Sequence, residues 1–311
     1  MRNVWLGLVV AGAAACSTPA STFEHRSELE FATRGVALAA GGEDGVVGMM
    51  DTTCQVDVSD ARIGSDYNFP TSDEVVHDNS LIGTTPAVIV ISDIGAHVTY
   101  PGRTWDWTAD DYGRPGIVAG RIWSEGVLLL GDDGAGGCEL SWFVNEGADV
   151  SSLSVPGAAC GGGGLAIDRL TGHVYVGTGE GILSADPSGT SDLPVEADLV
   201  VYDAAADVLY AALAGDSMLY GLEVDGTQRW ATDMGGAITS FDAMGSLAQA
   251  VVMVSLDTGL GSLMTVDGFT GAITSNLTTP EAALHVETDD EGKSLALALA
   301  REVHFFSVEG L

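Results

Sequence analysis

The chain has 311 residues, enough to bury a large core in one or two domains. It carries 44 Asp and Glu residues against 11 Lys and Arg residues, for a formal net charge of -33. So acidic a chain repels nucleic acid and anionic lipid surfaces, and its sequence contains no basic patch, which excludes a nucleic-acid function. The mean hydropathy of +0.25 is high for this charge. Apolar strands joined by acidic turns would give that combination.

The first sixteen residues, MRNVWLGLVVAGAAAC, have the pattern of an export signal. One basic residue, Arg2, precedes an apolar run over residues 4–10, and small residues follow as far as Cys16. A membrane span needs about 20 apolar residues, so this run is too short for one.

The three alanines before Cys16 resemble the lipobox of bacterial lipoproteins, although that family usually has Leu where this chain has Ala13. In that family the cysteine is diacylated and becomes the mature N-terminus. The resemblance implies a signal peptide over residues 1–15, a lipidated Cys16 and a tether over residues 16–20. Ser17, in place of Asp, implies an outer-membrane location with the lipid as the membrane contact. An ordinary cleaved signal peptide is the alternative.

From residue 21 onward, short apolar runs recur between Gly, Asp, Asn and Pro residues, as is typical of antiparallel strands. Groups of these runs repeat about every 42 residues, which predicts the four-stranded blades of a β-propeller. We therefore expect residues 21–311 to form an all-β fold, a single β-propeller of seven blades, with six or eight blades as alternatives. The repeats start near Glu28, Asp73, Ile117, Gly164, Leu199, Ile238 and Ala282.

The phrase LEVDGTQRW (222–230) predicts a turn at Asp225-Gly226 and an outer strand that carries Trp230 into the gap between two blades. It resembles the WD-like and PQQ-like repeat of quinoprotein-like propellers, in which a docking Trp follows a Gly by four positions. A second phrase, VDGFTGAITS, keeps Gly271 but has Ser275 at the Trp position. The resemblance covers one blade well and one in part.

Quinoprotein dehydrogenases bind pyrroloquinoline quinone and calcium, and several have a disulfide between adjacent cysteines, which this chain lacks. The histidines do not have zinc-site spacing, and the acidic clusters do not have the spacing of a calcium loop. No serine lies in a nucleophile-elbow motif. We therefore expect no catalytic residue, no cofactor and no metal, as in the non-catalytic members of the family. Those members include the propeller lipoprotein of the outer-membrane protein assembly machinery.

Three aspartates, Asp168, Asp203 and Asp242, occupy one position in successive repeats, at the end of the first strand. We expect each to accept backbone N–H bonds and close the turn that follows. The residues expected on the channel wall are Leu165, Val200, Thr239 and His285.

The last repeat ends after its third strand, so residues 21–26 are expected to add the fourth strand and close the ring. We call the end of the ring where the innermost strands start face X, and the opposite end face Y. Cys138 and Cys160 both fall on face X and are expected to form a disulfide, which export permits. Cys54 falls on face Y and is expected to stay reduced, and three free buried thiols are the alternative.

Long loops on face X of the first three repeats carry residue types that are enriched at interfaces. The candidate binding surface consists of Tyr67, Phe69, Tyr112 and Arg114. The sequence thus predicts a monomeric, non-catalytic envelope lipoprotein that binds another envelope or extracellular protein, or a glycan. Merely variable loops are the alternative for the surface. A catalytic propeller of the lactonase, lyase or quinoprotein type is the alternative for the function.

Overall fold

A computed structural model of the chain describes residues 7–8, 22–30, 37–41, 46–50, 56–58, 75–82, 85–92, 95–100, 103–108, 116–144, 149–160, 164–288, 294–299 and 302–309. These residues form β-strands and two short 3-10 helices, η1 (Gly157–Cys160) and η2 (Gly245–Leu247).

The described strands assemble into seven sheets in which every neighbouring pair is antiparallel. The first three sheets consist of β3 (Ala37–Gly41), β4 (Val46–Met50) and β5 (Val56–Val58); β6 (Val75–Ile82), β7 (Thr85–Ser92), β8 (Gly95–Tyr100) and β9 (Arg103–Thr108); and β10 (Gly116–Trp123), β11 (Gly126–Asp132), β12 (Cys138–Val144) and β13 (Asp149–Val155).

The next three sheets consist of β14 (Leu165–Ile167), β15 (Val174–Gly177), β16 (Ile182–Asp186) and β17 (Gly189–Leu193); β18 (Leu199–Asp203), β19 (Val208–Ala212), β20 (Met218–Leu222) and β21 (Gln228–Asp233); and β22 (Ala237–Ala243), β23 (Gln249–Ser255), β24 (Gly261–Asp267) and β25 (Ile273–Thr279). The seventh sheet consists of β26 (His285–Thr288), β27 (Ser294–Ala298), β28 (Glu302–Glu309) and β2 (Thr22–Glu30). A two-residue strand, β1 (Gly7–Leu8), pairs with the outer edge of β25.

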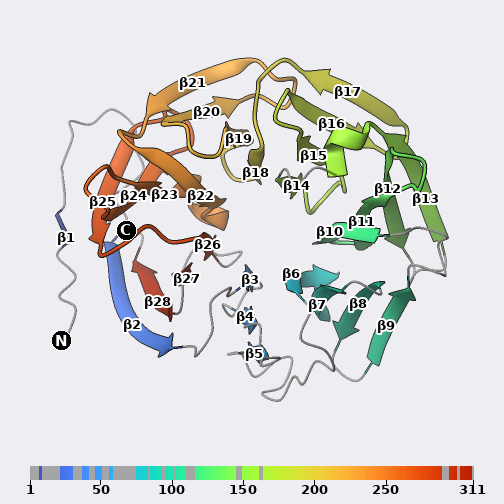
Figure 1. Cartoon of the computed structure of the whole chain (residues 1–311), viewed down its shortest axis with the longest axis horizontal. Coiled ribbons are helices and arrows are strands. Elements are labelled where there is room, and N and C mark those ends of the chain that lie inside the picture. The colour runs from blue at the N-terminus through green and yellow to red at the C-terminus, as the bar shows by residue number, and fades with distance from the viewer. Residues whose placement is uncertain are drawn as a thin grey trace.

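The sheets stand side by side around a central axis as the blades of a propeller (Figure 1). Their innermost strands form a closed ring, because each contacts the next in the order β3, β6, β10, β14, β18, β22, β26 and back to β3. This arrangement confirms the all-β propeller with antiparallel blades.

Burial follows the position of a strand within its blade. The second strands β11 and β19 are almost wholly apolar and buried, since a neighbouring blade covers each side of them. The outer strands β13 and β17 are mostly polar and exposed. Apolar side chains of adjacent blades form the core between them, as in the cluster that joins Tyr210, Trp230 and Phe241.

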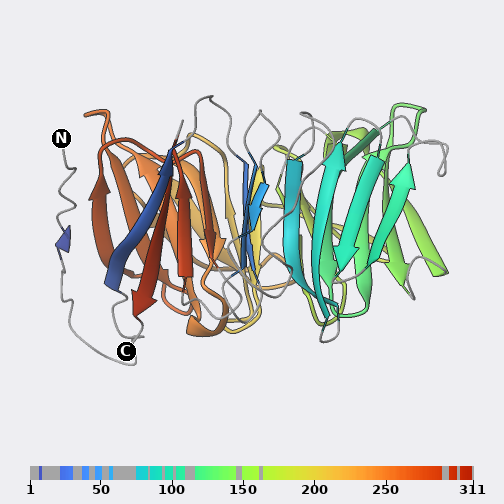
Figure 2. The same cartoon turned by 90° about the horizontal axis from the view of Figure 1, so that it is seen from below.

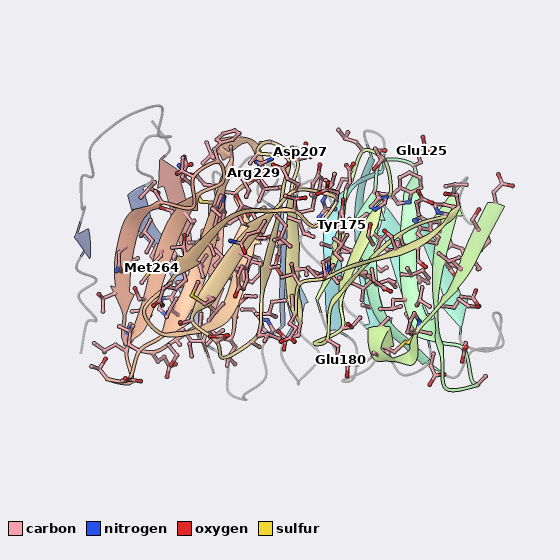
Figure 3. All side chains as sticks on the ribbon, turned by 90° about the horizontal axis from the view of Figure 1, so that it is seen from above. Glu125, Tyr175, Glu180, Asp207, Arg229 and Met264 are labelled. Atoms are coloured by element: carbon pink, nitrogen blue, oxygen red, sulfur yellow. A yellow bond between two sulfur atoms is a disulfide. The ribbon has the colours of Figure 1, made fainter. Side chains whose placement is uncertain are left out.

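The strands of each blade run between the two faces of the ring (Figure 2). Innermost strands run from face X to face Y, so the loops after the first and third strands lie on face Y. Figure 3 shows this for Glu125, Asp207 and Arg229, which lie at one end of the blades, while Glu180 lies at the other. Face Y therefore carries the Asp207 and Arg229 turns, and face X carries the Glu180 turn.

An N-terminal strand closes the ring. β2 pairs with β28 along its whole length, from Thr22 opposite Glu309 to Glu30 opposite Glu302. The closing strand expected over residues 21–26 is thus confirmed, and it extends further than expected. The start of the first repeat near Glu28 is wrong, because that residue belongs to the closing strand and the first blade begins with β3.

The turn phrase of blade five forms as expected. Gly226 has a φ of 85°, and the Asp225 carboxylate accepts the Thr227 N–H at 2.8 Å. Trp230 lies on the outer strand β21 and is 8% exposed. Its Nε1 donates to the carbonyl oxygen of Gly268 in blade six at 2.8 Å. The tryptophan therefore docks one blade onto the next, as predicted.

Candidate functional site

Six residues singled out from the sequence lie outside the described residues. They are the lipidation cysteine Cys16, the thiol Cys54, and the surface residues Tyr67, Phe69, Tyr112 and Arg114. Their roles stay predictions.

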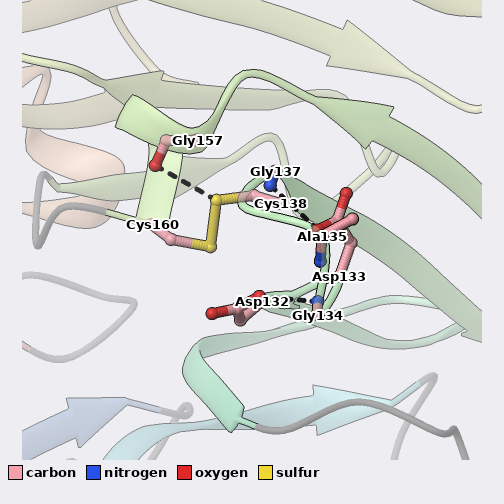
Figure 4. Close-up of a disulfide and its surroundings, with 8 residues drawn as sticks. All are labelled: Asp132, Asp133, Gly134, Ala135, Gly137, Cys138, Gly157 and Cys160. Atoms are coloured by element: carbon pink, nitrogen blue, oxygen red, sulfur yellow. Dashed lines mark hydrogen bonds between the residues drawn. A yellow bond between two sulfur atoms is a disulfide. The ribbon is translucent and has the colours of Figure 1, made fainter.

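The two remaining cysteines are joined across face X of blade three. Cys138 begins β12 and Cys160 ends η1, and the structure links them in a disulfide with 5.9 Å between their Cα atoms (Figure 4). The same close-up shows that the preceding acidic loop is a turn. The Asp133 carboxylate accepts the N–H groups of Ala135 and Gly137 at 2.7 and 2.9 Å. The pairing is the one expected from the sequence.

A cavity of about 680 Å³ lies in the centre of the ring among the innermost strands of blades three to seven. It extends from Gly164, where β14 is about to begin, to the loops at the other ends of these strands, including Leu170, Ala205 and Gly245. Those loops lie on face Y, so the cavity opens there. Leu170 stands at this mouth with 75% of its surface exposed. Volume and concavity are those of a small-ligand site.

Two arginines form the wall at blades three and four. Arg121 on β10 donates from Nε to the Leu165 carbonyl at 2.8 Å and from Nη1 to the Gly120 carbonyl at 3.0 Å. Arg169, in the loop after β14, donates from Nη1 to the Ile122 carbonyl at 2.9 Å. Backbone carbonyls of both blades thus orient the two guanidinium groups at the cavity.

The expected aspartate turns form in blades four and five. The Asp168 carboxylate accepts the Leu170 N–H at 2.9 Å and the Thr171 hydroxyl. That of Asp203 accepts the N–H groups of Ala205 and Ala206 at 2.8 and 3.1 Å. It also accepts the Tyr210 hydroxyl at 3.0 Å. Burial raises the pKa of the Asp203 carboxyl.

Asp242 departs from this pattern. Its Oδ2 accepts the N–H of Thr288 in blade seven at 2.7 Å, so the carboxylate joins two blades and makes only one bond in its own strand, to the Ala243 N–H. The expected turn-closing role is wrong for this residue, because β22 continues through it to Ala243. Burial in the cavity wall raises the pKa of Asp242 to about 6.

The hydrogen bonds from Thr288 oppose that shift in part, because they stabilise the charged carboxylate. The Thr288 Oγ1 lies 2.9 Å from Asp242 Oδ2 and 2.6 Å from the Ala243 carbonyl oxygen. A hydroxyl has one hydrogen and cannot donate to both acceptors. The Thr288 hydroxyl therefore donates either to the Asp242 carboxylate or to the Ala243 carbonyl.

Tyrosines and carboxylates adjoin the mouth over blades four and five. The Tyr202 hydroxyl donates to Asp207 Oδ1 at 2.9 Å, and its ring centroid lies 5.8 Å from that of Tyr175. Burial, followed by the charges of Asp168 and Asp207, raises the pKa of Tyr175 to about 12. Burial and the bond to Asp207 raise the pKa of Tyr202. Both tyrosines are therefore neutral hydrogen-bonding groups.

His173, Ser184 and Asp186 are the three side-chain types of a nucleophilic Ser-His-Asp triad. His173 Nε2 shares a hydrogen bond of 2.7 Å with Ser184 Oγ, and its Nδ1 lies 4.0 Å from Asp186 Oδ2. Ser184 is 5% exposed on the third strand of its blade, and Asp186 accepts the N–H groups of Ser188 and Gly189. A nucleophile must reach its substrate. This arrangement instead ties the second strand of blade four to the third.

The described part of the chain has neither a candidate metal centre nor a helix able to span a membrane. There, no group of three or more His, Cys, Asp or Glu side chains is arranged to hold a metal ion. Within the same ranges, no helix has the length and apolar character needed to cross a membrane.

Of the four expected channel residues, Leu165 and Val200 line the cavity. Thr239 instead donates its hydroxyl to the Ala283 carbonyl at 2.9 Å, and the wall of blade seven begins one residue after His285. Sequence reasoning missed Arg121 and Arg169. The feature of the sequence that could have pointed to them is the rarity of basic residues. The chain has only 11, and two of these lie in corresponding parts of adjacent repeats.

The chain matches no protein-family model and no curated protein. Among solved structures it is similar to a chain in a crystal structure of the mitotic checkpoint complex, with a TM-score of 0.62 and 11% identity over 97% of this chain and 100% of that one. It is also similar to Raptor from Chaetomium thermophilum, with a TM-score of 0.67 and 14% identity. That match covers 94% of this chain and 29% of Raptor. At these identities the likeness shows the propeller fold alone.

Proposed function

We propose that this protein is a non-catalytic envelope lipoprotein whose propeller binds a partner protein at the mouth of its central cavity on face Y. The observation that carries the proposal is the cavity of about 680 Å³ with the exposed Leu170 at its rim. A rigid ring of blades presents this site without the need for chain movement, which lowers the cost of binding.

Further apolar side chains are exposed on the same face. Val224 and Phe269 lie in turns between third and fourth strands and are 42% and 51% exposed. Exposed apolar groups among polar loops are typical of protein-binding surfaces. One structural neighbour belongs to a complex of proteins, the mitotic checkpoint complex, and this agrees with the proposal at the level of fold.

The lipid anchor and the site lie on the same side of the molecule in this proposal. β2 begins at Thr22, beside Glu309 at the face Y end of β28. Residues 17–21 separate Cys16 from Thr22, and these six residue steps reach roughly 20 Å at most when extended, so a lipid on Cys16 holds face Y towards the membrane. The partner is then a protein embedded in the same membrane. Replacing Cys16 with Ser abolishes acyl labelling and releases the protein from the membrane fraction in this proposal.

Paired surface variants test the docking face. Leu170→Ser with Phe269→Ser removes apolar groups from face Y, and Leu260→Ser with Leu284→Ser removes groups of 40% and 49% exposure from face X. The lipidated protein is crosslinked in intact cells, and the crosslinked envelope protein is identified and quantified. We expect the face Y pair to lose the crosslink and the face X pair to keep it, with equal melting temperatures.

Alanine substitutions at Tyr67, Phe69, Tyr112 and Arg114 test the surface predicted from the sequence on face X. If these four changes remove the crosslink and the face Y pair does not, the partner docks on face X and the present placement is wrong.

A further inference from the structure

We propose that the outer edge of β25 in blade six binds an extended, uncharged segment of the partner protein by strand addition. In the full chain this edge holds β1, which lies within the expected signal peptide. The inference rests on the proposed function, in which processing before Cys16 removes residues 1–15 and frees the edge. It names how the partner is held, because Phe269 of face Y lies in the turn that leads into β25.

The edge is the outer side of blade six. β25 pairs with β24 along its inner side, so the backbone N–H and C=O groups of alternate residues point away from β24. β1 pairs antiparallel with this outer side, with Gly7 opposite Leu277 and Leu8 opposite Asn276. Figure 1 shows β1 outside the ring, on the side of β25. The geometry of β25 therefore accepts a further strand.

β25 has no charged residue, unlike the other outermost strands that the structure describes. Its sequence is ITSNLTT, and the turn before it, residues 268–272, is also uncharged. Each of the other outermost strands, β2, β5, β9, β13, β17 and β21, carries at least one charged side chain. Charged side chains on an edge hinder its pairing with another strand. Among the described sheets, the edge without this protection is the one that holds a further strand.

The side chains of β25 suit strand addition. Leu277 is 6% exposed and packs in the core between blades six and seven, which fixes the strand in place. Ile273, Asn276 and Thr278 are exposed along it. The Ser262 hydroxyl donates to Asn276 Oδ1 at 2.8 Å, so the amide hydrogens of Asn276 are left to donate to a ligand. In strand addition, backbone pairing gives affinity and such side-chain contacts give specificity.

Net charge favours a different protein over a second copy of this chain. Two copies joined edge to edge would bring together two chains with a formal net charge of -33 each, and their repulsion opposes this pairing. The segment that binds is uncharged, because β25 offers no side chain to pair with a charge. The residues of β1, Gly7 and Leu8, have this character.

A peptide probe tests the edge on processed protein that is purified from the envelope in mild detergent. The probe has the sequence of residues 4–11, VWLGLVVA, with two lysines added at each end for solubility. The control peptide has the same side chains and charge but carries N-methyl groups on alternate backbone nitrogens, which removes hydrogen-bond donors. We expect the probe to bind at one site by fluorescence anisotropy, and the control to bind about 10-fold more weakly or less, since several backbone hydrogen bonds are lost.

Paired variants locate the binding. Ile273→Lys with Thr278→Lys places two charges on the edge and should weaken probe binding about 10-fold or more. Thr190→Lys with Ser191→Lys is the matched control, because it makes the same change of charge at exposed positions of β17 in blade four. Equal melting temperatures show that both variants fold. Equal binding of the two peptides by the wild type, or unchanged probe binding by the β25 variant, would overturn the proposal.

The occupant is tested in cells and in solution. A photo-crosslinking residue at position 278 should capture the same membrane protein that is crosslinked through face Y. Failure to capture it would overturn the proposal. So would sedimentation of the processed protein as a dimer that the β25 variant cannot form, because the occupant would then be a second copy.

The two proposals fail in different ways. Processed protein that binds the probe and captures the partner but carries no acyl group contradicts the lipid anchor alone. Acylated protein that binds no probe contradicts the strand addition alone. Protein that keeps residues 1–15 in cells, measured by mass spectrometry, contradicts both, because β1 then stays on the edge.

Discussion

At the residue scale, many of the aspartates that make the chain acidic have a structural role, because they close turns. Asp133, Asp168, Asp186, Asp225 and Asp267 each accept backbone N–H groups two to four residues further along the chain. A carboxylate that closes a turn in this way needs no basic partner. The excess of acidic over basic residues is therefore compatible with a well-ordered fold.

Glycine at 271 is required by a close approach as well as by its backbone. Its φ is 71°, and an added Cβ would lie 2.6 Å from the ring of Trp230. We expect Gly271→Ala to lower the free energy of unfolding by about 2–4 kcal/mol, because backbone strain and overpacking add.

Gly259→Ala is the matched control, since Gly259 has a φ of 79° and open space around the added Cβ. It should cost about 1 kcal/mol from the backbone alone. Urea unfolding of both variants measures the difference. Equal losses would show that the Trp230 contact does not constrain position 271.

Asp242 should make stability depend on pH in an unusual direction. Its folded pKa of about 6 exceeds the ordinary value of about 4, so between these values the folded state binds more protons than the unfolded state. The stabilisation is present below about pH 4 and is lost as the pH rises through about 6. We expect Asp242→Asn to gain stability relative to the wild type across this window.

Asp225→Asn provides the control of opposite sign. The Thr227 N–H lowers the pKa of the Asp225 carboxyl, so its contribution is lost as the pH falls. Unfolding curves measured from about pH 3 to about pH 8 cover both windows. A wild-type curve parallel to that of Asp242→Asn would contradict the assignment.

The Cys138–Cys160 disulfide closes a loop of 22 residues. In the chain-entropy description, a loop of this size stabilises the fold by about 3 kcal/mol. We expect Cys138→Ser with Cys160→Ser to lower stability by this order. Peptide mapping without reduction should recover the linked pair, and a Cys54 crosslink would contradict the pairing.

At the element scale, closure of the ring depends on one strand that comes from the opposite end of the chain. β2 forms eight residue pairs with β28, and without it the edge of β28 would be exposed. Exposed edges promote pairing between molecules. Closure is therefore both a source of stability and a protection against aggregation.

Deleting residues 21–26 should remove half of this pairing, the four pairs made by Thr22, Phe23, Glu24 and His25. We expect the melting temperature to fall by on the order of 10 °C and the protein to aggregate on heating, because several strand pairs are lost together. Deletion of residues 17–20 is the control, since it leaves β2 intact. Differential scanning calorimetry measures both. A deletion of 21–26 that melts like the control would contradict the role of β2.

At the scale of the whole molecule, the net charge of -33 opposes compaction, and the described ion pairs do little to offset it. Raising NaCl from about 10 mM to about 500 mM shortens the screening length from about 30 Å to a few ångströms. We expect the melting temperature to rise with salt, because repulsion between carboxylates is screened. A melting temperature that falls with salt would show that attractive pairs dominate.

Much of this architecture was predictable because it is local. Strand lengths, turn residues and the repeat of about 42 residues are features of neighbouring residues in the sequence. They predicted the propeller, the closing strand and the docking of Trp230. Cys138 and Cys160 were also predictable, because alternating strand direction assigns each loop to a face. The start of the first repeat near Glu28 was misassigned because a closing strand and a first strand have the same alternation of apolar and polar residues.

The cavity was decided only by the tertiary structure. Arg121 and Arg169 belong to different blades, and nothing in the spacing of their repeats shows that backbone carbonyls orient both towards the centre of the ring. Asp242 has the same sequence context as Asp168 and Asp203, yet its partner is Thr288 in the next blade. Contacts across blades depend on how the ring closes. Ring closure depends on the small rotations between successive blades along the whole chain, and no local sequence pattern specifies it.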